Sequence, residues 1–381
     1  MMYMKVRLGN YIKEYSKKNK ADEDIPVYSV TNTQGFCRDY FGKEVASKDK
    51  TTYKIVPQGC FAYNPSRINV GSVDWQRDEE RVIVSPLYNV FSVSEELDQE
   101  YLYYYLKSDF ALQRIRAVAT GSVRDNLKLE MLKEFPILLP PKNDQKTIAN
   151  NLDRVKRVIE LRKSEIDKMD DLIKARFVEM FGDINVKWKE VTMTDICKDM
   201  RTGPFGSALH HDEFVDKGIF VLGIDNAVEN KFSYNRMRYI TEEKYEKLKR
   251  YTVHPGDVII TIMGTVGRSA VVPKDMPKAI NTKHLACLTP DTNMVDSYFL
   301  VNAFQIHPLI RHQLESQSKG AIMNGLNLTI IKGLKFRLPP LELQKEFVDF
   351  YNQVDKSKVA VQKALEKTQL LFDSLMQQYF V

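Results

Sequence analysis

The pattern of apolar and polar residues is most regular in two long segments, residues 142–181 and 341–380. Neither segment contains proline or glycine. Apolar residues recur at steps of three and four in the first segment, at Ile148, Leu152, Val155, Ile159, Ile166, Met169 and Ile173. The second segment has apolar residues at the same phases: Phe347, Tyr351, Val354, Val361, Leu365, Phe372 and Leu375. This spacing predicts two long helices, each with an apolar seam.

The two predicted helices are expected to pack against each other. A helix of about 40 residues would be about 60 Å long and, alone, would leave its seam in water. Pairing the helices buries both seams, although Arg162 interrupts the first seam and Lys358 the second. Mixed-sign charges on the other faces are typical of a solvated coiled-coil surface. We therefore predict an antiparallel coiled coil.

The helices belong to an internal duplication. A shift of 199 residues carries Leu139-Pro140-Pro141 onto Leu338-Pro339-Pro340 and Gln145-Lys146 onto Gln344-Lys345. The same shift matches Leu172 with Leu371 and Phe181 with Phe380. Because proline disfavours helix immediately before it, each Pro-Pro marks the point where a globular body ends and a helix begins.

The prediction is an α+β fold with a pseudo-two-fold internal repeat, in which two mixed α/β bodies are separated by the helices. Upstream of the helices, "YKIVPQGCFAYN" from Tyr53 resembles "YTVHPGDVIIT" from Tyr251, each with a turn before an apolar strand. We expect bodies at residues 1–141 and 185–340, a central helix at 142–184 and a C-terminal helix at 341–381.

Composition and charge narrow the function only a little. The chain has 381 residues, 43% of them hydrophobic, and a net charge of +6, which permits nucleic acid as a partner without requiring it. The start "MMYMKVRLGN" lacks an apolar leader, and no apolar run reaches about 18 residues. The cysteines are scattered, with no C-x-x-C pair. We expect a cytoplasmic protein with reduced thiols and no membrane association.

Several motifs resemble the specificity (S) subunits of type I restriction–modification systems, and the resemblance covers essentially the whole chain. They are "FPILLPPKNDQKTIANNLDRV", "LPPLELQKEFVDF", "LIKARFVEMFGD", "YNPSRINVGSV" and "RTGPFGS". The resemblance implies that residues 1–141 and 185–340 are target recognition domains, each of which reads one half of an interrupted sequence in double-stranded DNA. It also implies that the helices dock methyltransferase subunits, expected to be two, and fix the half-site spacing.

The resemblance also implies that catalysis and cofactor binding belong to partner subunits. S-adenosylmethionine, ATP and Mg²⁺ are expected only on partner subunits, namely the methyltransferase and, where the complex cleaves DNA, a restriction (motor) subunit. This chain is expected to hold no cofactor or metal and to catalyse nothing. The sequence leaves open a complex that only methylates.

In the first body, two loops carry candidate DNA-binding residues. The loop "NPSRINVGSVDW" contributes Asn64, Ser66, Arg67, Asn69 and Trp75. Arg67 has the donor fork that reads guanine, Asn69 suits adenine, and Ser66 suits a phosphate. The segment "ATGSVRDN" contributes Ser122 and Arg124. The alternative is that these are ordinary surface turns.

In the second body, four segments carry candidates. They contribute Thr202, Phe205 and Ser207 in "RTGPFGSAL", Thr265 and Arg268 in "TIMGTVGR", Lys283 and His284 in "NTKHL", and Lys319 and Asn324 in "SKGAIMNG". "TIMGTVGR" is expected to occupy the place of "NPSRINVG" in the first body. Plain connecting turns are again the alternative.

Enzymatic functions find little support. "NPSR" has Arg67 where the Asn-Pro-Pro-aromatic motif of amino-methyltransferases needs an aromatic residue, and no G-x4-G-K-[ST] motif is present. Asp257 follows Pro255-Gly256 and is better explained as a turn residue than as a metal ligand. We therefore predict a non-catalytic DNA-recognition subunit. The alternative is a protein-interaction scaffold with two adaptor domains on a coiled-coil rod.

Overall fold

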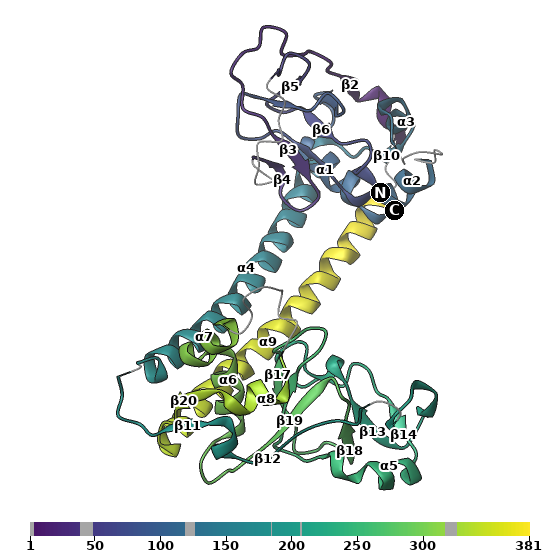
Figure 1. Ribbon diagram of the computed structural model, residues 1–381. Coiled ribbons are helices and arrows are strands. Elements are labelled where there is room, and N and C mark those ends of the chain that lie inside the picture. Colours follow the sequence, from purple (N-terminus) through teal and green to yellow (C-terminus); the bar gives the residue numbers. More distant parts are fainter. Residues whose placement is uncertain (1–3, 39–48, 119–125, 184, 206–207, 317–325) are drawn as a thin grey trace. The chain divides into compact units, whose positions relative to one another are not determined.

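The structure is a computed structural model that describes residues 4–38, 49–118, 126–183, 185–205, 208–316 and 326–381. The chain forms two compact units, one of residues 1–164 with 362–381 and one of residues 165–361. Each unit contains a mixed α/β body and part of both long helices, α4 (Lys142–Phe181) and α9 (Leu341–Phe380). Both ends of the chain belong to the first unit (Figure 1).

The body of the first unit is built on a four-stranded antiparallel sheet of order β2-β9-β6-β7. These strands are β2 (Ile12–Glu14), β9 (Asn89–Val93), β6 (Phe61–Tyr63) and β7 (Val73–Trp75). Three two-stranded pairs join β1 (Lys5–Arg7) to β10 (Pro136–Leu138), β3 (Ser29–Thr31) to β4 (Gly35–Cys37), and β5 (Lys54–Pro57) to β8 (Arg81–Val84). The body helices are α1 (Gln99–Lys107), α2 (Asp109–Val118) and α3 (Leu129–Lys133).

The body of the second unit has a four-stranded antiparallel sheet of order β12-β19-β16-β17. Its strands are β12 (Cys197–Thr202), β19 (Leu285–Pro290), β16 (Val258–Thr261) and β17 (Ser269–Val271). A second sheet has the order β14 (Tyr239–Ile240), β13 (Ile219–Leu222), β18 (Ala279–Asn281) and β15 (Thr252–Val253). β11 (Glu190–Thr192) pairs with β20 (Lys335–Arg337), and the helices are α5 (Glu242–Leu248), α6 (Ser297–Ile306), α7 (Pro308–Ser316) and α8 (Leu328–Gly333).

The two bodies share one topology, which confirms the duplication seen in the sequence. The main sheets have equivalent orders, and β1-β10 corresponds to β11-β20. β5-β8 corresponds to β15-β18, and the parallel bridge between Val27 and Ile83 corresponds to the parallel pairing of β13 with β18. The second body adds β14 beside β13, so its second sheet is more extensive.

In the first unit, the beginning of α4 packs against the end of α9. Leu152 is fully buried in the same core as Phe380. The hydroxyl of Tyr104 donates to Asp153 Oδ1 at 2.5 Å, while its ring lies 6.2 Å from that of Phe372. Arg162, which interrupts the apolar seam, donates to the carbonyl of Ala364 and the hydroxyl of Thr368.

In the second unit, the end of α4 packs against the beginning of α9. Phe177 and Phe347 are fully buried, with ring centroids 5.2 Å apart. Lys358, the residue that interrupts the second seam, donates to Asp170 Oδ1 at 2.5 Å. Within each unit, residues later in α4 contact residues earlier in α9. The two helix segments therefore run antiparallel, and the predicted antiparallel pairing is confirmed within each unit. No helix in the described ranges is long and apolar enough to cross a membrane.

Candidate nucleic-acid interface

The loop between β6 and β7 in the first unit is a compact turn built by its own polar residues. The Asn64 side-chain oxygen accepts from the Ser66 amide at 3.0 Å, a local bond that favours a turn. Ile68 is fully buried and anchors the loop, and Gly71 has a φ of 85°, which favours glycine. Arg67 and Val70 are exposed, and Asn69 is half-buried. The loop therefore presents Arg67 and Val70 to solvent from a fixed base.

A second predicted segment meets this loop. The Ser66 hydroxyl donates to Asn126 Oδ1 at 2.6 Å, and the Leu127 amide donates to the Pro65 carbonyl at 3.1 Å. Asn126 is the last residue of "ATGSVRDN", whose other candidates, Ser122 and Arg124, lie outside the described residues. The structure thus brings the end of this segment onto the β6–β7 loop.

Two basic residues that the sequence analysis did not select also adjoin the loop. Arg116 Nε donates to the Asn69 carbonyl at 3.3 Å. A Cβ at Gly71 would lie 3.6 Å from Lys107 Cδ, so the Lys107 side chain passes beside the turn. Burial lowers the pKa of Lys107 to about 8. Lys107 lies on α1 and Arg116 on α2. Nothing in the sequence of these helices indicates that either residue faces the loop.

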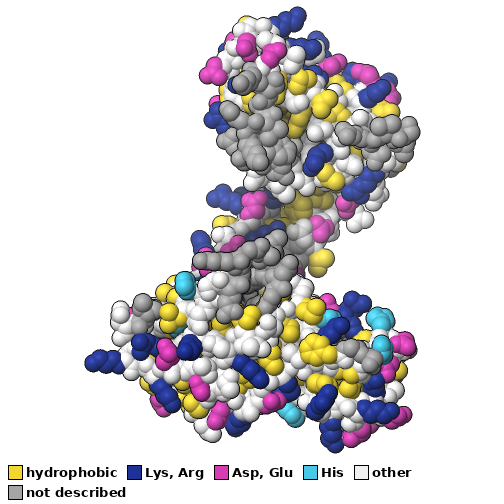
Figure 2. Space-filling view, in the orientation of Figure 1, with side chains coloured by type: hydrophobic (Ala, Val, Ile, Leu, Met, Phe, Trp, Pro, Cys, Tyr) yellow, Lys and Arg dark blue, Asp and Glu magenta, His cyan; other side chains and the backbone are white. Residues whose placement is uncertain are grey.

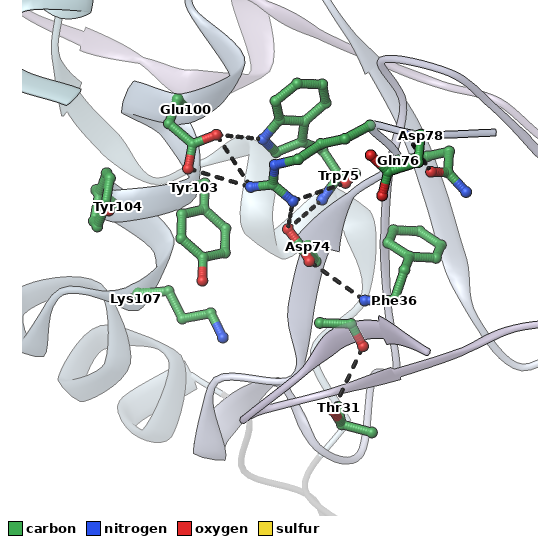
Figure 3. A network of polar contacts seen from close by, with 12 residues as sticks. Thr31, Phe36, Asp74, Trp75, Gln76, Asp78, Glu100, Tyr103, Tyr104 and Lys107 are labelled. Atoms are coloured by element: carbon green, nitrogen blue, oxygen red, sulfur yellow. Dashed lines mark hydrogen bonds and ion pairs between the residues drawn. The ribbon is translucent and has the colours of Figure 1, made fainter. Parts of the chain in front are cut away.

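Trp75, the fifth candidate in this segment, belongs to a polar network (Figure 3). Its indole N–H donates to Glu100 Oε2 at 3.0 Å, and the guanidinium of Arg77 lies 4.5 Å from the ring centroid. Arg77 also donates to Asp74 Oδ1 at 2.7 Å, and Asp74 Oδ2 accepts from the Phe36 amide at 3.3 Å. The network thus ties the β3–β4 hairpin to β7 and α1. The polar end of Trp75 is engaged there, and its contact with DNA stays a prediction.

Three candidate segments of the second unit converge. A Cβ at Gly203 would fall 2.2 Å from the Asn281 carbonyl oxygen, so "RTGPFGS" lies directly on "NTKHL". The Ile262 amide, at the start of the β16–β17 loop, donates to the His284 carbonyl at 2.9 Å. Phe205 is 61% exposed and Met263 is 48% exposed. Because the two main sheets have equivalent strand orders, the β16–β17 loop occupies the place of the β6–β7 loop, as predicted. Its neighbour is the "NTKHL" segment, on which "RTGPFGS" also lies.

The candidate side chains of this cluster differ in exposure. Lys283, Thr265 and Arg268 are exposed, whereas Thr202 and His284 are half-buried. The pKa of His284 is lowered first by burial and then by the charges of Lys283 and Arg238. Arg238 was not selected from the sequence, because it lies far from these segments along the chain. On the face shown in Figure 2, basic and acidic side chains are interspersed in each unit.

The remaining candidates cannot be compared with the structure. Ser207, Lys319 and Asn324 lie outside the described residues. The DNA-binding roles of the described candidates stay predictions.

Asp257 is hydrogen-bonded within its own turn and to an arginine of β12. Its Oδ2 accepts from the His254 amide at 2.9 Å and from Arg201 Nη2 at 2.9 Å. Within the described ranges, no group of three or more His, Cys, Asp or Glu side chains is arranged to hold a metal ion. The His254 contact fits the turn interpretation, and the contact with Arg201 is an ion pair to β12.

Comparison with known proteins gives the family. Residues 5–169 and 185–370 match the type I restriction modification DNA specificity domain. The chain is 22% identical to the type I restriction enzyme EcoBI specificity subunit of Escherichia coli, over 89% of this chain and 78% of that protein. It is also 22% identical to the MjaVIII specificity subunit of Methanocaldococcus jannaschii, over 95% of this chain and 90% of that protein.

Solved structures share the fold. A chain from work on complex assembly and conformational transition of the type I R-M system has a TM-score of 0.61 and 18% identity, covering 99% of this chain and 97% of that chain. A type I restriction-modification S subunit from M. genitalium has a TM-score of 0.59 and 17% identity, covering 100% of this chain and 96% of that chain. Two bodies of one topology, each with a cluster of polar loops, make this a protein of two equivalent domains. The chain belongs to the type I restriction–modification DNA specificity family, and each matched domain covers one body and most of the long helix that follows it.

Proposed function

We propose that this chain is the sequence-specific DNA-binding subunit of a type I restriction–modification complex and that it reads an asymmetric, bipartite target. One observation carries the proposal: a single topology occurs twice, with different side chains on the equivalent loop. The β6–β7 loop presents Arg67 and Val70, whereas the β16–β17 loop presents Met263, Thr265 and Arg268. Equivalent scaffolds with unlike loops are suited to reading unlike base sequences.

The exposed side chains on both loops fit the chemistry of the major groove. Arginine offers a donor fork to guanine, and an apolar side chain such as Val70 or Met263 can contact the methyl group of thymine. Val70 is 52% exposed. Met263 is 48% exposed, so an apolar side chain on each loop is accessible for such a contact.

Methyltransferase subunits would dock on the long helices. Leu172 in the second unit and Leu371 in the first are related by the repeat, and each is 50% exposed. The preceding helical turn has lysine in both copies, Lys168 and Lys367. Other exposed leucines are not repeated, because Leu161 corresponds to Ala360 and Leu370 to Asp171. A repeated exposed leucine supports docking of the same partner on each unit.

The chemistry would belong to the partners. S-adenosylmethionine would bind to the methyltransferase subunits, and ATP and Mg²⁺ to a restriction subunit where one is present. This chain would contribute recognition and half-site spacing, with no catalysis of its own.

The test is to express the chain with its methyltransferase partners and map methylated bases by methylation-sensitive sequencing of cellular DNA. We expect a motif of two unlike halves, and replacement of residues 1–141 by another such body should change only one half. Binding to the matching duplex should weaken steeply with salt because phosphate contacts release counterions. Absence of both a methylation motif and DNA binding would instead favour an interaction scaffold with two adaptor domains, and DNA binding without sequence preference would contradict the proposed reading of a bipartite target.

A further inference from the structure

Arg238, in the second unit, is held in a fixed orientation beside the converging candidate segments. Its Nη2 donates to Asp225 Oδ2 at 2.7 Å. Asp225 lies in a one-turn 3-10 helix, Ile224–Asn226, that follows β13. Asn226 is fully buried, accepts from the Gly223 amide at 2.8 Å and donates to the Ser233 carbonyl at 2.7 Å. Because these bonds fix the turn, they also fix the carboxylate that orients Arg238.

Gly223 provides the space that the guanidinium occupies. A Cβ at this position would fall 2.7 Å from Arg238 Nη1. The φ of Gly223 is −125°, a value that any residue adopts. A larger residue here would therefore displace the guanidinium from its present position, although it would not strain the backbone. The guanidinium lies directly against the backbone at the end of β13.

The same turn contacts the other candidate segments. A Cβ at Gly264, in the β16–β17 loop, would lie 3.0 Å from Ile224 Cδ1. The Thr282 amide, in "NTKHL", donates to the Leu222 carbonyl at 2.9 Å. The charges of Lys283 and Arg238 both act on the His284 imidazole. The turn that orients Arg238 thus lies beside both the β16–β17 loop and "NTKHL".

We propose that Arg238, oriented by Asp225 across Gly223, reads a guanine in the half-site bound by the second unit. This inference rests on the proposed function. A planar guanidinium presents paired donors that match guanine O6 and N7, and recognition improves when a second residue fixes the orientation of the side chain. The Arg238 side chain keeps 22% of its surface exposed, enough to present an edge.

The ion pair also argues against a simple phosphate contact. The carboxylate of Asp225 offsets the positive charge of Arg238, which weakens attraction to phosphate but leaves the directional N–H donors in place. The exposed ammonium of Lys283 has no such neighbour among the described residues and suits a phosphate better. Asp225 is accordingly a positioning residue.

The experiment uses the full complex of this chain with its methyltransferase partners. The wild-type motif is mapped first, and duplex binding is then measured with each base pair of the second half-site replaced in turn. We expect the wild-type complex to lose about 5- to 150-fold in affinity when the cognate guanine is replaced. Arg238→Ala should bind the original and replaced duplexes equally, with the first half of the motif unchanged. Arg238→Lys should lose part of the discrimination, because it keeps the charge but replaces the planar fork by a flexible ammonium group.

Control variants separate the alternatives. Arg236→Ala removes an exposed arginine two residues away and should leave the motif unchanged. Asp225→Ala should relax the same base position as Arg238→Ala, and Asp225→Glu should restore part of the discrimination. Equal weakening on every duplex in Arg238→Ala would make Arg238 a phosphate contact and overturn the proposal, as would an unchanged motif. If the alanine variant does not fold, Arg238→Lys decides. A wild-type complex with no motif would instead refute the proposed function.

Discussion

Gln145 and Gln344 make the same three hydrogen bonds, each within its own unit. Gln145 Oε1 accepts from the Asp98 amide at 2.8 Å, and its Nε2 donates to the carbonyls of Glu96 and Pro140. Gln344 accepts from the Asp296 amide at 2.9 Å and donates to the carbonyls of Met294 and Pro339. Both glutamines are fully buried. Asp98 and Asp296 cap α1 and α6, so each glutamine joins the start of a long helix to the start of a body helix.

Replacing either glutamine should destabilise its unit. Gln145→Ala leaves one amide and two carbonyls without these partners in a buried site, a loss we expect to cost about 2–4 kcal/mol. Urea denaturation of the full chain, followed by circular dichroism, measures the effect. Gln344→Ala should behave in the same way. Lys146→Ala and Lys345→Ala are matched controls, because these neighbouring residues are repeated but exposed. Equal stability of the glutamine and lysine variants would contradict this role.

The second unit should lose stability as the pH falls from 6.5 towards 4. His307 is buried between the rings of Phe177 and Phe336, and burial lowers its pKa to about 4. Between the folded pKa and the ordinary value near 6.5, the unfolded chain binds the proton more readily than the folded chain does. The loss should reach about 3 kcal/mol near pH 4.

The substitution His307→Asn separates this contribution from the general acid response. Asparagine can still accept from the Leu309 amide, as His307 Nδ1 does at 3.2 Å, but it does not titrate. Its unfolding free energy should change less between pH 6.5 and 4 than that of the wild type. His312→Asn, at an exposed position of α7, should retain the wild-type pH dependence. Parallel curves for His307→Asn and the wild type would refute the prediction.

Gly35→Ala should disrupt the β3–β4 hairpin. Gly35 has a φ of 64°, and an added Cβ would fall 1.8 Å from Asp74 Oδ2. Gly59→Ala is the matched control in the same unit, with a φ of 81° and its nearest neighbour at 3.8 Å. The control should lose about 1–2 kcal/mol from backbone strain alone. Gly35→Ala should lose clearly more, measured by thermal unfolding, unless the Asp74 network is removed as well. Similar losses in both variants would mean that Asp74 moves aside easily.

Leu172→Asp and Leu371→Asp should each weaken the binding of one methyltransferase subunit. Both leucines are half-exposed, so the substitutions should change folding stability little while placing a charge in an apolar contact. We expect about a 30-fold loss at one site per substitution, as for an interface hot spot, and loss of both sites in the double variant. Mass measurement of the reconstituted complex reports the number of bound subunits. Leu161→Asp and Leu370→Asp are controls on exposed leucines that the repeat does not share, and equal effects there would refute the assignment.

The sequence predicted the parts of the fold that depend on periodicity. Seven-residue spacing and the absence of proline and glycine sufficed to predict α4 and α9, because a long amphipathic helix has a strong local pattern. The role of Gln145 was not predictable, although its repetition was visible. Its three partners come from the turn before α1 and from the Pro-Pro segment, and no local pattern links them.

The candidate site could likewise be predicted only in part from the sequence. Position in a loop was enough to select Arg67 and Arg268, which are exposed as expected. Loop position did not indicate that the Trp75 indole would be bonded to Glu100 on α1. The sequence analysis did not select Arg238. Its partner Asp225 follows β13 and its neighbour Lys283 follows β18, and only the folded sheet brings these segments together.

The first unit draws its last helical segment, residues 362–381, from the far end of the chain. Phe380 supplies an aromatic contact to Tyr101, 5.2 Å between ring centroids, so part of that core is missing until residues 362–381 have been synthesised. The second unit is continuous along the chain and can complete its own core earlier. During synthesis, the half translated first should therefore be the half that finishes folding last.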